Sequence, residues 1–196
     1  QEFFRHPEDI KKAGLTGSLD GKRVIVQGLG NVGYHAAKFL SEEDGSIVTG
    51  IIERDGALVS DAGLDIEAVH GWITKHGGVN GYPDATFVAD GPSVLEKECD
   101  ILIPAALEGV INMGNAANVV APLIIEAANG PVTAGADVIL REKGTVIIPD
   151  MYANAGGVTV SYFEWVKNLS HIRFGRMQRR QEEARHQLVV DELESL

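Results

Sequence analysis

The fold is decided by residues 22–33, which read Lys22-Arg23-Val24-Ile25-Val26-Gln27-Gly28-Leu29-Gly30-Asn31-Val32-Gly33. The centre of this stretch is apolar and β-branched, as in a strand that is buried on both faces. Three glycines follow in the spacing Gly-x-Gly-x-x-Gly, and a helical pattern then continues through Leu40. In such a turn the first glycine permits the tight bend, the second lets a pyrophosphate approach the backbone, and the third lets the helix pack closely on the strand. We therefore predict a strand, a phosphate-binding turn and a helix.

A second strand is predicted over residues 46–52, and it ends directly before Glu53. Glu53 lies twenty positions after Gly33, where dinucleotide-binding units place the carboxylate that accepts the adenosine ribose hydroxyls. The competing interpretation of Glu53 is a solvated acid at the end of a strand. Arg54 bears on cofactor choice, because a neighbouring arginine can hold a 2′-phosphate. We expect NAD as the cofactor, with NADP possible.

The alternation of strands and helices continues along the chain. Further short apolar strands are predicted over residues 86–88, 99–103, 123–126 and 145–148, and helices over residues 65–76 and 133–143. After Pro149 two consecutive helices are predicted, over residues 158–169 and 176–196. This pattern is typical of an α/β fold: a doubly wound Rossmann-type, mostly parallel sheet with helices on both faces, followed by C-terminal helices. We assign residues 1–170 to an NAD(P)-binding Rossmann domain and residues 171–196 to a truncated C-terminal helical extension of it.

Composition excludes several classes of protein. The chain has 196 residues, a net charge of −11 and 44% hydrophobic residues, which argues against disorder and against a general nucleic-acid binder. Cys99 is the only cysteine, so no disulfide forms within the chain and a metal site is not expected. The longest uncharged stretch, residues 109–125, is interrupted by Asn, Gly and Pro, so no membrane span is expected. The chain does not begin with Met, and we expect it to be a piece of a longer, cytoplasmic protein.

Three small or polar residues follow the predicted strands at one edge of the sheet. Ala105 and Ala106 come after the strand that ends at Pro104, and Asn129 comes after the strand that ends at Glu126. Ligands of doubly wound sheets lie outside the carboxyl ends of the strands, so these residues are candidates for the cofactor site. A simple turn before Gly130-Pro131 explains Asn129 equally well.

The segment after Pro149 contains a further set of candidates. Asn154, Val158, Ser161 and Trp165 are spaced four, three and four residues apart, so on a continuous helix they share one face. Gly156-Gly157 disfavours a helix start, which suggests that something approaches the backbone closely. The alternative is an ordinary helix N-terminus with a serine on its buried face.

These residues together resemble the coenzyme-binding domain of the glutamate dehydrogenases, within the dehydrogenases that act on glutamate, leucine, phenylalanine and valine. The matching stretches are residues 26–33, 99–106, 126–133 and 147–169, within a likeness that runs from about Leu19 to Phe174. Residues 129–133 and 161–168 are similar to the glutamate branch. The resemblance implies reversible, NAD(P)-dependent oxidative deamination of L-glutamate to 2-oxoglutarate and ammonia.

The resemblance also implies roles for individual residues. The pyrophosphate would lie on the glycine turn, the adenosine ribose on Glu53, and the nicotinamide half near Ala105, Ala106, Asn129 and Asn154. The implied cofactor-binding residues are Gly28, Leu29, Gly30, Asn31, Val32, Gly33, Glu53, Arg54, Ala105, Ala106, Asn129 and Asn154. Val158 and Ser161 would shape the pocket for the amino-acid substrate.

The catalytic Lys and Asp of the family belong to an N-terminal substrate domain that has no counterpart in this chain. We therefore expect no catalytic residue here, and dinucleotide binding without turnover. The resemblance implies a homo-oligomer, the family's hexamer, in the full-length enzyme. Two alternatives stay open: a related leucine, phenylalanine or valine dehydrogenase, and a non-catalytic NAD-binding module.

Overall fold

The structure is a computed structural model, and it describes residues 2–169. The chain divides into two compact units, Gln1–Ala155 and Gly156–Leu196. The predicted helix over residues 176–196 lies outside the described residues. The first unit holds the sheet, and α6 (Ala155–Leu169) is the element of the second unit that the structure describes.

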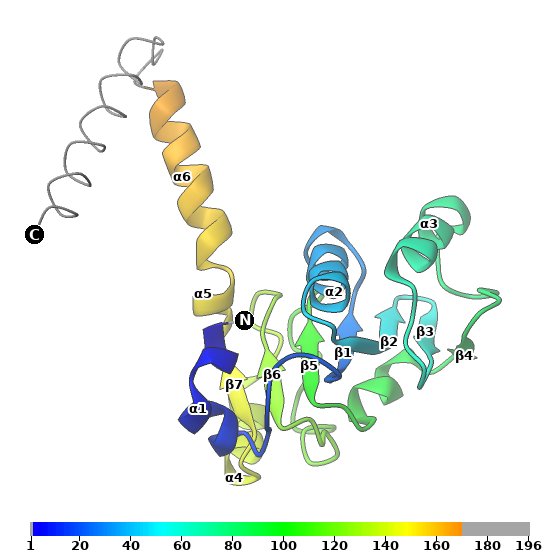
Figure 1. Cartoon of the computed structure of the whole chain (residues 1–196), viewed down its shortest axis with the longest axis horizontal. Helices are drawn as coiled ribbons and strands as arrows, with labels where there is room; N and C mark the ends of the chain where they lie inside the picture. Colours follow the sequence, from blue (N-terminus) through cyan, green and yellow to red (C-terminus); the bar gives the residue numbers. More distant parts are fainter. Residues whose placement is uncertain (1, 170–196) are drawn as a thin grey trace, which may run out of the picture. The chain divides into compact units, whose positions relative to one another are not determined.

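A seven-stranded sheet forms the centre of the first unit (Figure 1). Its strand order is β4-β3-β2-β1-β5-β6-β7. The neighbours β2, β1, β5, β6 and β7 pair in parallel, and β3 pairs antiparallel with both β2 and β4. The strands are β1 (Arg23–Gln27), β2 (Ile47–Glu53), β3 (Gly56–Val59), β4 (Thr86–Val88), β5 (Ile101–Pro104), β6 (Leu123–Ile125) and β7 (Val146–Ile148). The predicted doubly wound, mostly parallel sheet is thereby confirmed.

Helices cover both faces of this sheet, as predicted. On one face α2 (Asn31–Glu42) and α3 (Ile66–His76) contribute Ala37 and Val69 to a buried cluster with β1 and β2. On the other face η2 (Gly91–Glu96) and α4 (Ala134–Glu142) contribute Leu95 and Leu140 to a second cluster. Both clusters are apolar, so burial on the two faces fixes the sheet in the middle layer.

Local sequence signals explain where the helices begin and end. The Asp65 side chain accepts a hydrogen bond from the Ala68 N–H at 2.9 Å, which caps the start of α3. Gly77 ends α3 in the left-handed conformation at φ 81°. Thr133 caps α4, its side chain accepting from the Ala136 N–H at 3.4 Å. These local contacts fix where α3 begins and ends and where α4 begins, and thus where the connecting loops start.

Several elements differ from the sequence prediction. The β3 strand was not predicted, and it pairs back on β2 through a two-residue turn, Arg54-Asp55, directly before Gly56. Short helices also form at η1 (Glu2–Arg5), α1 (Pro7–Lys12) and α5 (Asp150–Ala153). The helix expected from Val158 begins at Ala155, so the two glycines lie inside α6, since propensity is overridden by context.

Candidate functional site

The glycine turn joins the carboxyl end of β1 to the start of α2. Gly28 has φ +86°, a conformation that favours glycine, and its N–H donates to the Ile52 carbonyl at 2.7 Å. A Cβ on Gly28 would lie 2.5 Å from the Cβ of Ala106. Glycine is therefore required here both by backbone conformation and by the close approach of the loop after β5.

The other two glycines of the turn differ in what surrounds them. A Cβ on Gly33 would overlap the carbonyl oxygen of Gly28, so no larger residue fits at that position. A Cβ on Gly30, in contrast, would meet nothing within 4 Å. The protein's own packing thus explains Gly33 but not Gly30, and it leaves open space beside Gly30 for a group from outside.

Within residues 2–169, the first turn of α2 presents backbone N–H groups that no side chain caps, beside that space. Gly30 is the N-cap residue, no side chain caps this end, and no acidic residue lies in the first turn. Asn31 and Val32 are exposed. An uncapped helix N-terminus favours an anion, because its N–H groups and the helix dipole point outward. The turn therefore fits a dinucleotide's pyrophosphate.

Glu53, at the end of β2, contacts the glycine turn directly. Its Oε1 atom accepts a hydrogen bond from the Leu29 N–H at 2.6 Å. No hydrogen bond to its Oε2 atom occurs among residues 2–169. The structure thus brings the predicted acid against the predicted turn, with one carboxylate oxygen left as an acceptor.

The residues after Glu53 are held by the loop that follows α3. The Arg54 guanidinium donates to the Gly77 carbonyl at 3.1 Å, and Arg54 is exposed. Asp55 accepts from the Val79 N–H at 2.9 Å and the Asn80 N–H at 3.1 Å. Partial burial raises the pKa of Asp55, but these backbone hydrogen bonds outweigh it, so the pKa lies below its usual range. The position of Glu53 is thereby fixed on its carboxyl-terminal side.

Ala105 and Ala106 lie next to the glycine turn, across from Glu53. The Ala105 N–H donates to the Gln27 carbonyl at 2.8 Å, and the Ala106 N–H donates to the Gln27 side chain at 3.3 Å. Gln27 is buried. The sequence prediction did not include Gln27 in the site; its signal was a polar residue that ends an otherwise apolar strand. It positions the alanines that the prediction did name.

Glu126 is a second positioning residue that the prediction missed. It is buried, and its two carboxylate oxygens accept from the Val132 N–H at 3.2 Å and from the Asp150 N–H at 3.0 Å. Asp150 in turn accepts from the Gly130 N–H at 2.8 Å. These bonds tie the exposed turn that carries Asn129 to the start of α5, and Asn154 is the residue that follows the end of α5.

The predicted substrate residues Val158 and Ser161 lie in the second unit, on α6. Together with Trp165 they follow the three- and four-residue spacing that places side chains on one helix face. The Ser161 hydroxyl donates to the Gly157 carbonyl of the same helix at 2.9 Å, and Val158 is exposed. The Ser161 hydroxyl is thus hydrogen-bonded within its own helix, on the same exposed helix face as Val158.

No group of three His, Cys, Asp or Glu side chains within residues 2–169 is placed to hold a metal ion. In the same residues no helix is both long and apolar enough to cross a membrane.

Comparison with known proteins places this geometry in a family. Residues 6–192 match the model of the Glutamate/Leucine/Phenylalanine/Valine dehydrogenase family. The chain is 51% identical over 195 residues to the mitochondrial glutamate dehydrogenase of Dictyostelium discoideum, covering all of this chain and 39% of that protein. It is 48% identical over 156 residues to the NADP-specific glutamate dehydrogenase of Saccharolobus shibatae, covering 80% of this chain and 36% of that protein.

The fold agrees with solved structures of the same family. The hetero-hexameric glutamate dehydrogenase of Thermus thermophilus, in its Leu-bound form, aligns with a TM-score of 0.72 and 31% identity over 93% of this chain and 42% of that one. The chain thus spans about two fifths of the length of the proteins it matches. It belongs to the glutamate/leucine/phenylalanine/valine dehydrogenase family.

Proposed function

We propose that this chain is the coenzyme-binding part of an NAD(P)-dependent glutamate dehydrogenase. The single observation that carries the proposal is the contact between Glu53 and the Leu29 N–H at 2.6 Å. It places a carboxylate beside an uncapped helix N-terminus with open space at Gly30. A pyrophosphate on the turn and a ribose diol on the free Glu53 oxygen would be bound together.

Each predicted residue has a distinct part in this proposal. The backbone of residues 28–33 binds the pyrophosphate, and Glu53 accepts hydrogen bonds from the adenosine ribose. Ala105 and Ala106 present a small surface to the flat nicotinamide ring, while Asn129 and Asn154 hydrogen-bond to the nicotinamide half. The bound dinucleotide supplies the hydride acceptor for oxidation of the amino acid at its Cα. Val158 and Ser161 contact the amino-acid substrate.

We favour NAD over NADP. A 2′-phosphate beside Glu53 would place two negative groups together, which is unfavourable. Arg54 would have to release the Gly77 carbonyl, 3.1 Å away, to offer its guanidinium to that phosphate. The relative from Saccharolobus shibatae is named NADP-specific, so NADP stays the alternative that the titration below must distinguish.

Glutamate is the substrate that the comparisons favour within the family. Two relatives that are identical to this chain at about half of the aligned positions are named glutamate dehydrogenases. We propose that the full-length protein deaminates L-glutamate to 2-oxoglutarate and assembles into a homo-oligomer, the family's hexamer; the Thermus thermophilus relative is named a hetero-hexamer. The relative from Dictyostelium discoideum is named mitochondrial, so the cytoplasmic location expected from the sequence stays a prediction.

The test is a calorimetric titration of the 196-residue chain with NADH and with NADPH, before and after Glu53→Ala. Loss of a charge-assisted hydrogen bond should weaken NADH binding about tenfold, and NADPH binding by less. Glu53→Gln keeps an acceptor for the Leu29 N–H and separates a damaged turn from a lost ribose contact. Glu43→Ala removes an exposed carboxylate after α2 and should leave both affinities unchanged.

Two outcomes would overturn parts of the proposal. If Glu53→Ala leaves NADH affinity unchanged, the ribose assignment is wrong. Hydride transfer from L-glutamate to NAD⁺, assayed separately with the same protein, should be absent, because the family's catalytic Lys and Asp are expected in another domain. Appreciable turnover by this chain would contradict that expectation.

A further inference from the structure

The chain contains two Asn-Gly pairs, Asn80-Gly81 and Asn129-Gly130. An asparagine that precedes glycine is prone to lose its side-chain amide, because glycine has no Cβ to keep its backbone nitrogen away from the asparagine side chain. Both asparagines are exposed, and both glycines have a positive φ, +82° at Gly81 and +53° at Gly130. Sequence and exposure therefore do not distinguish the two pairs, and their hydrogen bonds must.

The Asn80-Gly81 pair lies in an open turn after α3. The turn is closed by the Tyr82 N–H, which donates to the Val79 carbonyl at 3.2 Å. Within residues 2–169, neither the Gly81 N–H nor the Asn80 side-chain amide forms a hydrogen bond. A Cβ on Gly81 would meet only the ring of Trp72, at 3.7 Å. The Gly81 nitrogen and the Asn80 side chain are thus not held apart by bonds to other groups.

The Asn129-Gly130 pair, in contrast, is held on both sides of Gly130. Its N–H donates to Asp150 Oδ2 at 2.8 Å, and its carbonyl accepts from the Gly109 N–H at 2.9 Å. Asp150 is itself fixed, because its own N–H donates to the buried Glu126 at 3.0 Å. A carboxylate acceptor keeps the proton on the Gly130 nitrogen, and this charge-assisted bond must break before that nitrogen can react.

We propose that Asn80 is a site of spontaneous deamidation in the folded protein, and that Asp150 protects Asn129 from the same reaction. The Gly81 nitrogen gives its proton to hydroxide and forms a bond to Cγ of Asn80. The bond from Cγ to Nδ2 then breaks, and the amide leaves as ammonia. Water opens the resulting cyclic imide at either carbonyl, which gives aspartate or isoaspartate. The sum consumes one water and releases one ammonia, with no oxidation or reduction.

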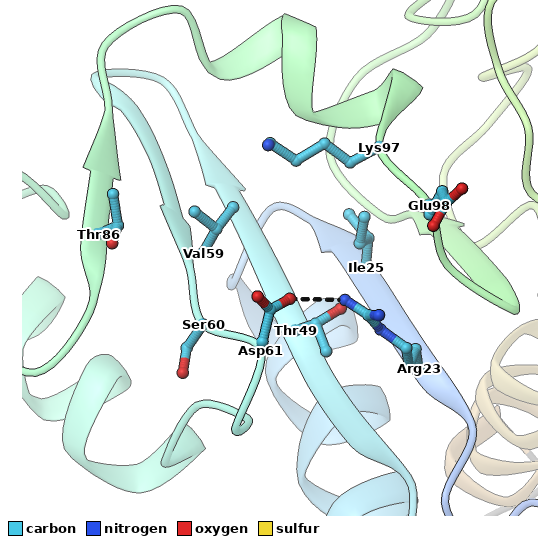
Figure 2. Close-up of a pocket in the computed structure, with 9 residues that line it drawn as sticks. All are labelled: Arg23, Ile25, Thr49, Val59, Ser60, Asp61, Thr86, Lys97 and Glu98. Atoms are coloured by element: carbon cyan, nitrogen blue, oxygen red, sulfur yellow. Dashed lines mark hydrogen bonds and ion pairs between the residues drawn. The ribbon is translucent and has the colours of Figure 1, made fainter.

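The reaction would add a negative charge beside Asp55. This residue accepts hydrogen bonds from two N–H groups of the same loop, that of Asn80 among them at 3.1 Å. Because like charges this close repel, and because isoaspartate lengthens the backbone, the loop should release the turn before β3. The loop after β3 is held separately, by the 2.7 Å ion pair of Asp61 with Arg23 (Figure 2). The change should therefore stay at the edge of the sheet that carries Glu53.

The test incubates the folded 196-residue chain at mildly alkaline pH and follows each asparagine by peptide-resolved mass spectrometry, which detects conversion of an amide to an acid. Asn80 should convert about tenfold or more faster than Asn129, because a hydrogen bond to a charged acceptor must first open at Gly130. In the chain unfolded by guanidinium this difference should disappear. Asn115 and Asn118, which alanine and valine follow, are internal controls and should convert more slowly than Asn80.

Two substitutions test the two environments separately. Asp150→Ala removes the acceptor of the Gly130 N–H and should raise the rate at Asn129 toward its rate in the unfolded chain, while the rate at Asn80 stays the same. Asn80→Gln should abolish the fast reaction, because the longer side chain closes a less favourable ring. Glu43→Ala removes an exposed carboxylate after α2 and should change neither rate.

The same rates contain the results that would overturn the proposal. Equal conversion of Asn80 and Asn129 in the folded chain, or faster conversion of Asn129, contradicts it. Conversion of Asn80 no faster than that of Asn115 contradicts it as well. An unchanged rate at Asn129 in a folded Asp150→Ala variant would show that Asp150 is not the protecting group. If that variant does not fold, the ratio of the folded to the unfolded rate at Asn129 in the unsubstituted chain decides whether the fold protects it.

Discussion

The glycine turn and α6 carry the two halves of the predicted site. The backbone of the turn is hydrogen-bonded within its own unit, whereas the apolar side chains of α6 are exposed. At the turn, Gly28, Leu29 and Ala106 are each held by a hydrogen bond to β1, β2 or the acid that ends β2. On α6, Val158, Phe163 and Trp165 are 72%, 65% and 57% exposed. The turn is closed by its own unit, whereas α6 presents a large apolar surface.

This difference separates two kinds of functional surface. A turn that binds a phosphate uses backbone groups, so the fold itself must place them, and each glycine is fixed by sterics or by the ligand. A helix that presents apolar side chains to solvent has not buried them within the described residues, and such surfaces mark sites of interaction. The comparison predicts that mutations at the turn affect folding and binding, and that mutations on α6 leave folding unchanged.

The largest effect is expected for Gly33→Ala. The new Cβ would overlap the Gly28 carbonyl oxygen, and because that atom belongs to the backbone, the turn or the helix must shift. We expect a loss of about 3 kcal/mol or more in the free energy of unfolding, measured by urea denaturation, together with loss of NADH binding.

Gly30→Ala is the matched control within the same turn. Its Cβ would meet nothing within 4 Å, so the free energy of unfolding should fall by only about 1 kcal/mol, the cost of alanine at an N-cap. NADH binding should nevertheless weaken, because the space beside Gly30 is the proposed place of the pyrophosphate. Equal losses of stability in the two variants would contradict the steric distinction.

Glu126→Gln is expected to cost less stability than Gly33→Ala. The substitution replaces one carboxylate oxygen by an amide group, which leaves either the Val132 or the Asp150 N–H facing a donor. We expect a loss of about 2 kcal/mol, since Glu126 is buried and both bonds are charge-assisted. Glu108→Gln, at an exposed position, should be neutral by the same thermal or urea measurement; a neutral Glu126→Gln would show that the carboxylate does not hold the two loops.

The sequence predicted the turn well because its rules are local. The spacing of Gly28, Gly30 and Gly33 and the position of Glu53 follow from one strand–turn–helix–strand unit, which the structure confirms as β1, α2 and β2. The contact of Glu53 with Leu29 then follows from parallel pairing of β1 and β2.

The roles of Gln27 and Glu126 could not be predicted in the same way. Gln27 accepts from Ala106, in the loop after β5, and Glu126 accepts from Asp150, after β7. These partners are distant in sequence, and only the sheet order β1-β5-β6-β7 brings them together. The β3 strand was missed for a different reason: it is only four residues long, and the turn before it, Arg54-Asp55, is not one of the glycine-containing pairs that mark a hairpin.

The smallest effect is expected for Trp165→Ser, which tests the α6 side of the comparison. Trp165 is 57% exposed, and tryptophan and serine have similar helix propensities, so the free energy of unfolding should change by less than about 0.5 kcal/mol. Leu102→Ala, at a fully buried position of β5, should cost about 2–5 kcal/mol in the same urea titration. A cost of about 2 kcal/mol or more for Trp165→Ser would mean that this chain already buries the α6 face in solution. The expected neutrality instead leaves that apolar face available for contacts outside the chain.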